Sequence, residues 1–264
     1  MDIQNLKQKG RIVLPSLFTI GNVAFGFFAI LSAIDTEYSR AGWFIILAMI
    51  MDAFDGRVAR MVKGESKFGV EMDSLADFLS FGLAPAYVMY LFLLKDFGFW
   101  GYPVAFIFAL CGSLRLAYFN VLSQEGKASK KYFSGLPIPM AAGILASFVI
   151  SYSLLESNEV SRSFKLLQAL MPMIYNLIPF IMLALGVLMV SRIPFPAFKQ
   201  ANFLRPKSIK TLLLLVVLVF LVIRYPQDAL FLLFVVYAIS GVLVYLWKGF
   251  RGMGKPKPDE SAAQ

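Results

Sequence analysis

The 264-residue chain contains no histidine and a single cysteine, Cys111. The missing histidines exclude a Ser–His–Asp triad, a histidine-ligated zinc site and a histidine-ligated haem within this chain. One cysteine cannot form an intrachain disulfide or a Cys-x-x-Cys metal site, and its apolar neighbours indicate a small buried side chain. Acid–base or metal chemistry in this chain therefore depends on aspartate and glutamate.

Charged residues are also scarce, at 16% of the chain against about 25% in soluble domains. Hydrophobic residues make up 59% and the mean hydropathy is +0.71, which is more apolar surface than one soluble core can hold. The sequence therefore predicts an all-α integral membrane protein. A membrane-spanning helix needs about 20 largely apolar residues. Eight segments meet this requirement: 14–34, 40–61, 70–94, 99–122, 135–155, 168–190, 209–225 and 227–248.

The 25 lysines and arginines are distributed unevenly between the two ends of these segments. Nineteen lie in the N-terminal region, the 57–67 turn, the 123–134 and 191–210 loops and the C-terminal tail, whereas only five lie on the opposite side. By the positive-inside rule both termini are cytoplasmic, which requires an even number of spans. The excess of basic residues, a net charge of +9, is therefore explained mainly by the orientation of the spans in the membrane. Attraction to anionic lipid head groups is a secondary effect. Nucleic acid is not an expected partner.

Four aspartates stand out, because ionisable side chains inside membrane spans are costly and usually functional. Asp52 and Asp55 lie near the end of the second predicted span, and Asp73 and Asp77 lie near the start of the third. Each pair shares one helix face, and the short turn between the spans makes the two helices antiparallel neighbours. The four carboxylates should converge and would repel one another unless divalent cations held them. Oxygen ligands of this kind suit Mg²⁺, Mn²⁺ or Ca²⁺.

Small residues accompany these aspartates. Gly56 and Ala59 follow Asp52 at helical spacing and lie on the same helix face. Their small side chains leave room on this face for a flat or bulky ligand. Arg60 comes next, and its guanidinium group can hold a phosphate. Because carboxylate-bound divalent metals leave room for phosphate oxygens, phosphoryl transfer at two metals is the leading hypothesis. The structural alternative is that the aspartates cap helix ends or pair with nearby arginines.

The spacing Asp52-x2-Asp55-Gly56-x2-Ala59-Arg60-x8-Gly69-x3-Asp73-x3-Asp77 resembles the signature of the CDP-alcohol phosphotransferases at every position. Members of that family transfer a phosphatidyl-type group from a CDP-linked lipid to an alcohol and release CMP. Five stretches resemble the membrane-embedded phosphatidylserine synthases within it: LPSLFTIGNVAFGFFAI, DSLADFLSFGLAPA, LRLAYFN, GLPIPMAAG and LMVSRIPFPAFK. The resemblance implies a six-helix catalytic core over 14–200, after a cytoplasmic segment at 1–13. Two additional helices would occupy 201–250, followed by a disordered cytoplasmic tail at 251–264.

The resemblance also implies a role for each signature residue. Asp52, Asp55, Asp73 and Asp77 would hold two divalent ions, Mg²⁺ or Mn²⁺, and Asp77 would in addition act as general base. The residues implied to contact the CDP-lipid are Asn22, Gly56, Ala59, Arg60 and Gly69. Arg115 is a candidate for binding phosphate or the serine carboxylate. Tyr118 departs from the pattern, because a basic residue is expected at that position.

The implied reaction moves the phosphatidyl group of CDP-diacylglycerol to the hydroxyl of L-serine and yields phosphatidylserine and CMP. The charge distribution predicts a protein of the cell membrane with the active site facing the cytoplasm, and the resemblance implies a homodimer. Glycerol phosphate, inositol, inositol phosphate or choline as acceptor, and an ether lipid as donor, are alternatives with the same chemistry. A divalent-cation transporter is a distant alternative, because the acidic residues gather at one membrane face and no inverted repeat is visible.

Overall fold

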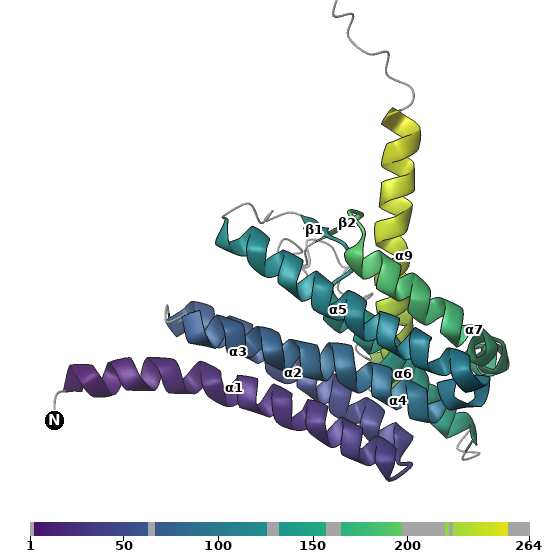
Figure 1. Ribbon diagram of the computed structural model, residues 1–264, viewed down its shortest axis with the longest axis horizontal. Coiled ribbons are helices and arrows are strands. Elements are labelled where there is room, and N and C mark those ends of the chain that lie inside the picture. Colours follow the sequence, from purple (N-terminus) through teal and green to yellow (C-terminus); the bar gives the residue numbers. More distant parts are fainter. Residues whose placement is uncertain are drawn as a thin grey trace, which may run out of the picture.

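The computed structural model describes residues 3–62, 67–125, 132–156, 165–196, 220–221 and 224–252. Most of them are helical, and α1, α2, α3–α4, α5 and α7 run alongside one another while α9 crosses them at a steep angle (Figure 1). The elements in chain order are α1 (Ile3–Ile34), α2 (Tyr38–Val62), α3 (Lys67–Asp77), the π-helical η1 (Phe78–Leu83), α4 (Ala84–Phe92), the 3₁₀-helical η2 (Leu94–Trp100), α5 (Gly101–Gln124), β1 (Tyr132–Ser134), α6 (Ile138–Glu156), α7 (Lys165–Val190), β2 (Pro194–Pro196) and α9 (Pro226–Gly252).

Six helical stretches of the described residues are long and apolar enough to cross a membrane: Leu17–Ile34, Phe68–Phe92, Leu94–Ser123, Ile138–Leu155, Ala169–Val190 and Pro226–Trp247. They coincide with six of the eight predicted spans and confirm an all-α membrane protein. The predicted span 40–61 is helical, but it does not join this set, because every 18-residue stretch of α2 contains Asp52, Asp55 and at least one arginine. The predicted span 209–225 lies almost entirely outside the described residues.

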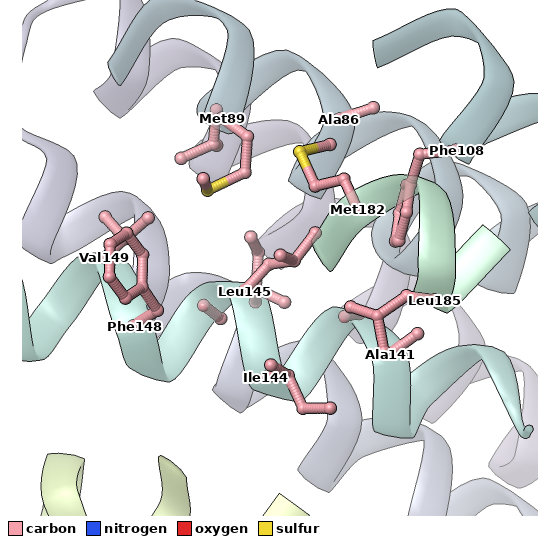
Figure 2. Close-up of a cluster of buried hydrophobic side chains, with 14 of the residues drawn as sticks. Ala86, Met89, Phe108, Ala141, Ile144, Leu145, Phe148, Val149, Met182 and Leu185 are labelled. Carbon is pink, nitrogen blue, oxygen red and sulfur yellow. The ribbon is translucent and has the colours of Figure 1, made fainter. Parts of the chain in front are cut away.

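The apolar core lies where α4, α5, α6 and α7 meet. Met89, Phe108, Leu145 and Met182, one from each of these helices, are completely buried and gather in one cluster (Figure 2). Lipid tails are as apolar as these side chains, so helices associate in a membrane mainly through close packing. Gly42 of α2 provides such packing, because a Cβ there would lie 2.8 Å from a backbone oxygen of α6.

The predicted span 70–94 is a continuous helical stretch, but it is not a uniform α-helix. Its middle, Phe78–Leu83, is a π-helical turn in which the N–H of Ala84 bonds to the carbonyl of Leu79. Pro85 has no N–H, so an α-helix would lack the hydrogen bond that residue 85 normally donates to the carbonyl four residues earlier. The wider π-helical turn accommodates the proline at this position. The π turn begins immediately after Asp77.

Two short strands lie at one end of the bundle and were not anticipated from the sequence. β1 and β2 pair in antiparallel fashion, with Phe133 opposite Phe195. Gly135 follows β1 with a φ of 81°, and a Cβ there would lie 2.8 Å from the Ser191 carbonyl oxygen. Phe195 is completely buried, and its ring centroid lies 5.8 Å from that of Tyr237. The strand pair therefore connects the end of α7 to α9.

The first turn of α9 is attached to α6 by a buried hydrogen bond. Ser151 Oγ donates to Asp228 Oδ1 over 2.8 Å, and Asp228 has no solvent exposure. The helix dipole favours a carboxylate in the first turn of a helix. A buried carboxylate that loses a hydrogen-bond donor is nevertheless destabilised, because water does not replace the lost bond.

We expect Ser151→Ala to lower the free energy of unfolding by about 1–3 kcal/mol, because Asp228 loses a buried donor. Thermal unfolding in detergent measures the effect. Ser153→Ala is the matched control, since among the described residues Ser153 Oγ bonds to the carbonyl of Val149 in its own helix. Equal unfolding temperatures for the two variants would show that the Ser151–Asp228 bond does not stabilise the contact between α6 and α9.

Candidate active site

Three of the four predicted aspartates meet in space. Asp52 of α2 and Asp73 and Asp77 of α3 each present a carboxylate oxygen, and these oxygens all lie within 4.8 Å of one another. All three residues are partly buried. The convergence expected from the helical spacing is therefore observed for this group, which we call the carboxylate cluster.

Asp55 lies beside the carboxylate cluster and is not among its three members. It is 5% exposed and accepts a hydrogen bond from the hydroxyl of Thr19 in α1. Three residues along an α-helix turn the side chain by about 300°, so Asp55 points roughly 60° away from Asp52. That rotation directs Asp55 towards α1, whereas Asp52 faces α3.

Asn22, also on α1, lies against the last member of the carboxylate cluster. Its Nδ2 donates to Asp77 Oδ1 over 3.1 Å, and its backbone carbonyl accepts a hydrogen bond from Ser80 Oγ over 2.9 Å. Sequence reasoning missed Thr19 and Ser80. A signal for Thr19 was present, because Thr19 and Asn22 are polar, three residues apart and surrounded by apolar residues.

The carboxylate cluster fits a hard divalent cation. Its ligand atoms are all oxygens, which Mg²⁺ and Mn²⁺ prefer over nitrogen or sulfur. The hydrogen-bond donors described above, Thr19 and Asn22, are neutral and leave the negative charge of the aspartates in place. Three carboxylates this close are unfavourable without a compensating positive charge.

The remaining signature residues lie along the same two helices. Gly56 of α2 is exposed, and a Cβ added there would meet no atom of the described residues within 4 Å, so the backbone is open to a ligand. Gly69 lies in the first turn of α3 and is partly buried. Ala59 and Arg60 belong to α2, but their side chains lie outside the part of the chain that the structure describes.

Arg115 is buried in α5 and does not belong to the carboxylate cluster. It is 6% exposed, and its guanidinium carbon lies 5.5 Å from the centroid of the Phe119 ring. Its Nε has no hydrogen-bond partner among the described residues. A buried guanidinium without a compensating anion is costly, so this position suits an anionic group of a ligand. Tyr118, where the family pattern has a basic residue, is 47% exposed.

Comparison with known proteins gives a family and several relatives. A family model described as CDP-alcohol phosphatidyltransferase matches residues 12–190, which include all four aspartates and Arg115 but not α9. A Helicobacter pylori protein named CDP-diacylglycerol–serine O-phosphatidyltransferase is 35% identical over 238 residues, covering 89% of this chain and 92% of that protein. A Methanocaldococcus jannaschii protein of the same name is 32% identical, covering 89% and 95%. The archaetidylserine synthase of Methanothermobacter thermautotrophicus is 38% identical and covers 70% of each chain.

Proposed function

The chain belongs to the CDP-alcohol phosphatidyltransferase family, and from this membership we propose that it transfers the phosphatidyl group of CDP-diacylglycerol to the hydroxyl of L-serine. The products are phosphatidylserine and CMP. The observation that carries the proposal is the carboxylate cluster, whose members occupy signature positions at the facing ends of α2 and α3. The names of the bacterial and archaeal relatives support serine as the acceptor.

In the proposed reaction Asp77 removes the proton from the serine hydroxyl. The serine oxygen then attacks the phosphorus that bears the diacylglycerol, and the bond from that phosphorus to the CMP oxygen breaks. Asp52, Asp55, Asp73 and Asp77 would hold two divalent ions, Mg²⁺ or Mn²⁺, which supply charge stabilisation for the entering and leaving oxygens. An aspartate with an ordinary pKa of about 3.9 is a weak base, so the position of Asp77 matters as much as its basicity.

The other signature residues would bind the CDP-lipid. Gly56 and Gly69 would let the cytidine and pyrophosphate approach the backbone, and the open space at Gly56 supports this role. Ala59 would keep the same face of α2 smooth, and Arg60 would hold a phosphate. Arg115, buried and with an unpartnered Nε, would bind a phosphate or the serine carboxylate.

We further propose eight membrane spans, with α2 and the 209–225 segment added to the six apolar stretches. Both termini and the carboxylate cluster then lie on the cytoplasmic side of the cell membrane, because nineteen of the 25 basic residues gather there. This orientation lets water-soluble serine and CMP exchange at the site. The family resemblance supports a homodimer.

The test measures CMP release by the purified protein in detergent with CDP-diacylglycerol and Mn²⁺ or Mg²⁺. Serine, glycerol 3-phosphate, inositol, inositol phosphate and choline are supplied in turn. Release that requires both serine and metal is the expected result. Release with another acceptor would retain the chemistry and overturn serine as the substrate, and metal uptake by proteoliposomes without any CMP release would favour a transporter.

An ether-lipid donor is the second candidate, because one relative is named archaetidylserine synthase. The same assay with the CDP-linked ether lipid decides between the donors. A higher kcat/KM for the ether lipid than for CDP-diacylglycerol would assign the protein to that substrate.

A further inference from the structure

One face of α1 contacts both helices that carry the aspartates. Thr19, Asn22 and Gly26 occupy this face at spacings of three and four residues. Thr19 donates to Asp55 of α2, and Asn22 donates to Asp77 at the end of α3. A single rigid helix surface therefore sets the direction of carboxylates that come from two different helices.

The contact is reinforced one turn further along α1. Ser80 lies in the π turn that follows Asp77, is completely buried, and donates to the backbone carbonyl of Asn22. Gly26 makes room for it, because a Cβ at Gly26 would lie 2.9 Å from Ser80 Cα. Asn22 is thus held through its backbone, and Asp77 is held through the turn that it precedes.

The amide of Asn22 is unfavourable for stability. The residue has no solvent exposure, and its Oδ1 has no hydrogen-bond partner among the residues that the structure describes. An ionised carboxylate only accepts hydrogen bonds, so Nδ2 has to face Asp77 and Oδ1 is left on the other side. A buried acceptor without a donor destabilises a fold. The benefit of this asparagine therefore lies in what Nδ2 does for Asp77.

We propose that the Thr19–Asn22–Gly26 face of α1 is a positioning surface for the active site, in which Asn22 orients Asp77 for proton removal and Thr19 holds Asp55. The inference rests on the proposed function, because Asp77 acts as a base only in that reaction. Asn22 and Thr19 are positioning residues that act through the aspartates. In the alternative implied by the family resemblance, Asn22 contacts the CDP group of the substrate.

The kinetic parameters of Asn22→Leu test the proposal. Leucine has nearly the same size and removes both the donor and the unpartnered acceptor. We expect kcat to fall roughly ten- to a hundred-fold, the effect of a misplaced catalytic group, with the KM values for serine and CDP-diacylglycerol changed by less than about twofold. The thermal unfolding midpoint should change little, because removing the buried unpartnered oxygen offsets the loss of the donor to Asp77. Ser32→Ala, a buried residue of the same helix away from the site, is the matched control and should leave kcat unchanged.

A second variant gives a readout that does not depend on turnover. Thr19→Val keeps the shape of the side chain and removes the hydroxyl that bonds to Asp55. We expect it to need a severalfold higher Mn²⁺ concentration than Ser32→Ala for half-maximal thermal stabilisation, because Asp55 is less well placed to hold a metal. An unchanged Mn²⁺ requirement would overturn the role of Thr19.

The outcomes that overturn the role of Asn22 are distinct from one another. An unchanged kcat in Asn22→Leu, with an active wild-type protein, overturns the inference alone. A raised KM for CDP-diacylglycerol with a retained kcat assigns Asn22 to the CDP group instead. A decreased unfolding midpoint with a proportionate loss of active protein assigns it a structural role. A folded wild-type protein that releases no CMP with any of the acceptors and with either lipid donor overturns the proposed function and the Asn22 role together.

Discussion

Asp77→Asn is expected to reduce the kcat for serine-dependent CMP release by roughly 10²- to 10⁴-fold, the contribution of a positioned general base. The amide has the shape of the carboxylate but cannot take the proton of the serine hydroxyl. Its oxygen can still accept the hydrogen bond that Asn22 donates over 3.1 Å in the unmodified protein, so the local packing should persist. Single-turnover measurement of CMP release with saturating CDP-diacylglycerol gives the rate of the chemical step.

The control for this variant is its binding of CDP-diacylglycerol, which should stay close to that of the unmodified protein. A matched variant, Asp35→Asn, removes an exposed carboxylate in the turn after α1 and should keep full activity. Turnover retained by folded Asp77→Asn would show that another group, or water alone, removes the proton.

Asp52→Asn is expected to change stability in opposite directions with and without metal. Without divalent ions, the substitution removes one of three carboxylates whose oxygens lie within 4.8 Å of one another. We expect it to raise the free energy of unfolding by several kcal/mol, because two like charges 4.8 Å apart repel by about 3.5 kcal/mol at an effective dielectric constant near 20. With Mn²⁺ or Mg²⁺, the unmodified protein should be stabilised by binding and the variant much less so. CMP release should be lost.

Thermal unfolding in EDTA and in a titration of Mn²⁺ measures both effects on the same preparation. Asp35→Asn again serves as the control, because it removes an aspartate charge outside the carboxylate cluster and should leave the metal response unchanged. A variant that is less stable than the unmodified protein in EDTA, yet equally stabilised by Mn²⁺, would show that Asp52 is a structural residue and not a metal ligand.

The membrane character and the approximate site followed from local sequence features. Hydropathy depends on composition within one segment, so six of the predicted spans could be recognised without knowing their neighbours. The convergence of Asp52 with Asp73 and Asp77 was also predictable. Helical periodicity determines which face of each helix carries the aspartates, and the short turn between the two helices makes them neighbours. α2 is less apolar than the six apolar stretches because it carries two of the signature aspartates, Asp52 and Asp55.

The features that were missed depend on contacts between distant residues. Ser80 bonds to Asn22, 58 residues away, and Thr19 bonds to Asp55, 36 residues away. No periodicity within one helix indicates such a pair. The π turn after Asp77 and the β1–β2 pair, which packs Phe195 against Tyr237, were missed because both are short elements that depend on contacts with neighbouring elements.

By itself, the sequence determined that the protein is a helical membrane protein without histidine and without an intrachain disulfide, and that its four signature aspartates lie on two adjacent helices. It also determined the family, because eight signature residues stand at fixed spacing within Asp52–Asp77. Only the tertiary structure decided which three carboxylates share one space, and that α1 supplies the donors to Asp55 and Asp77. The physical reason is that helix propensity and hydropathy are local properties, whereas the direction of a side chain depends on how neighbouring helices pack around it.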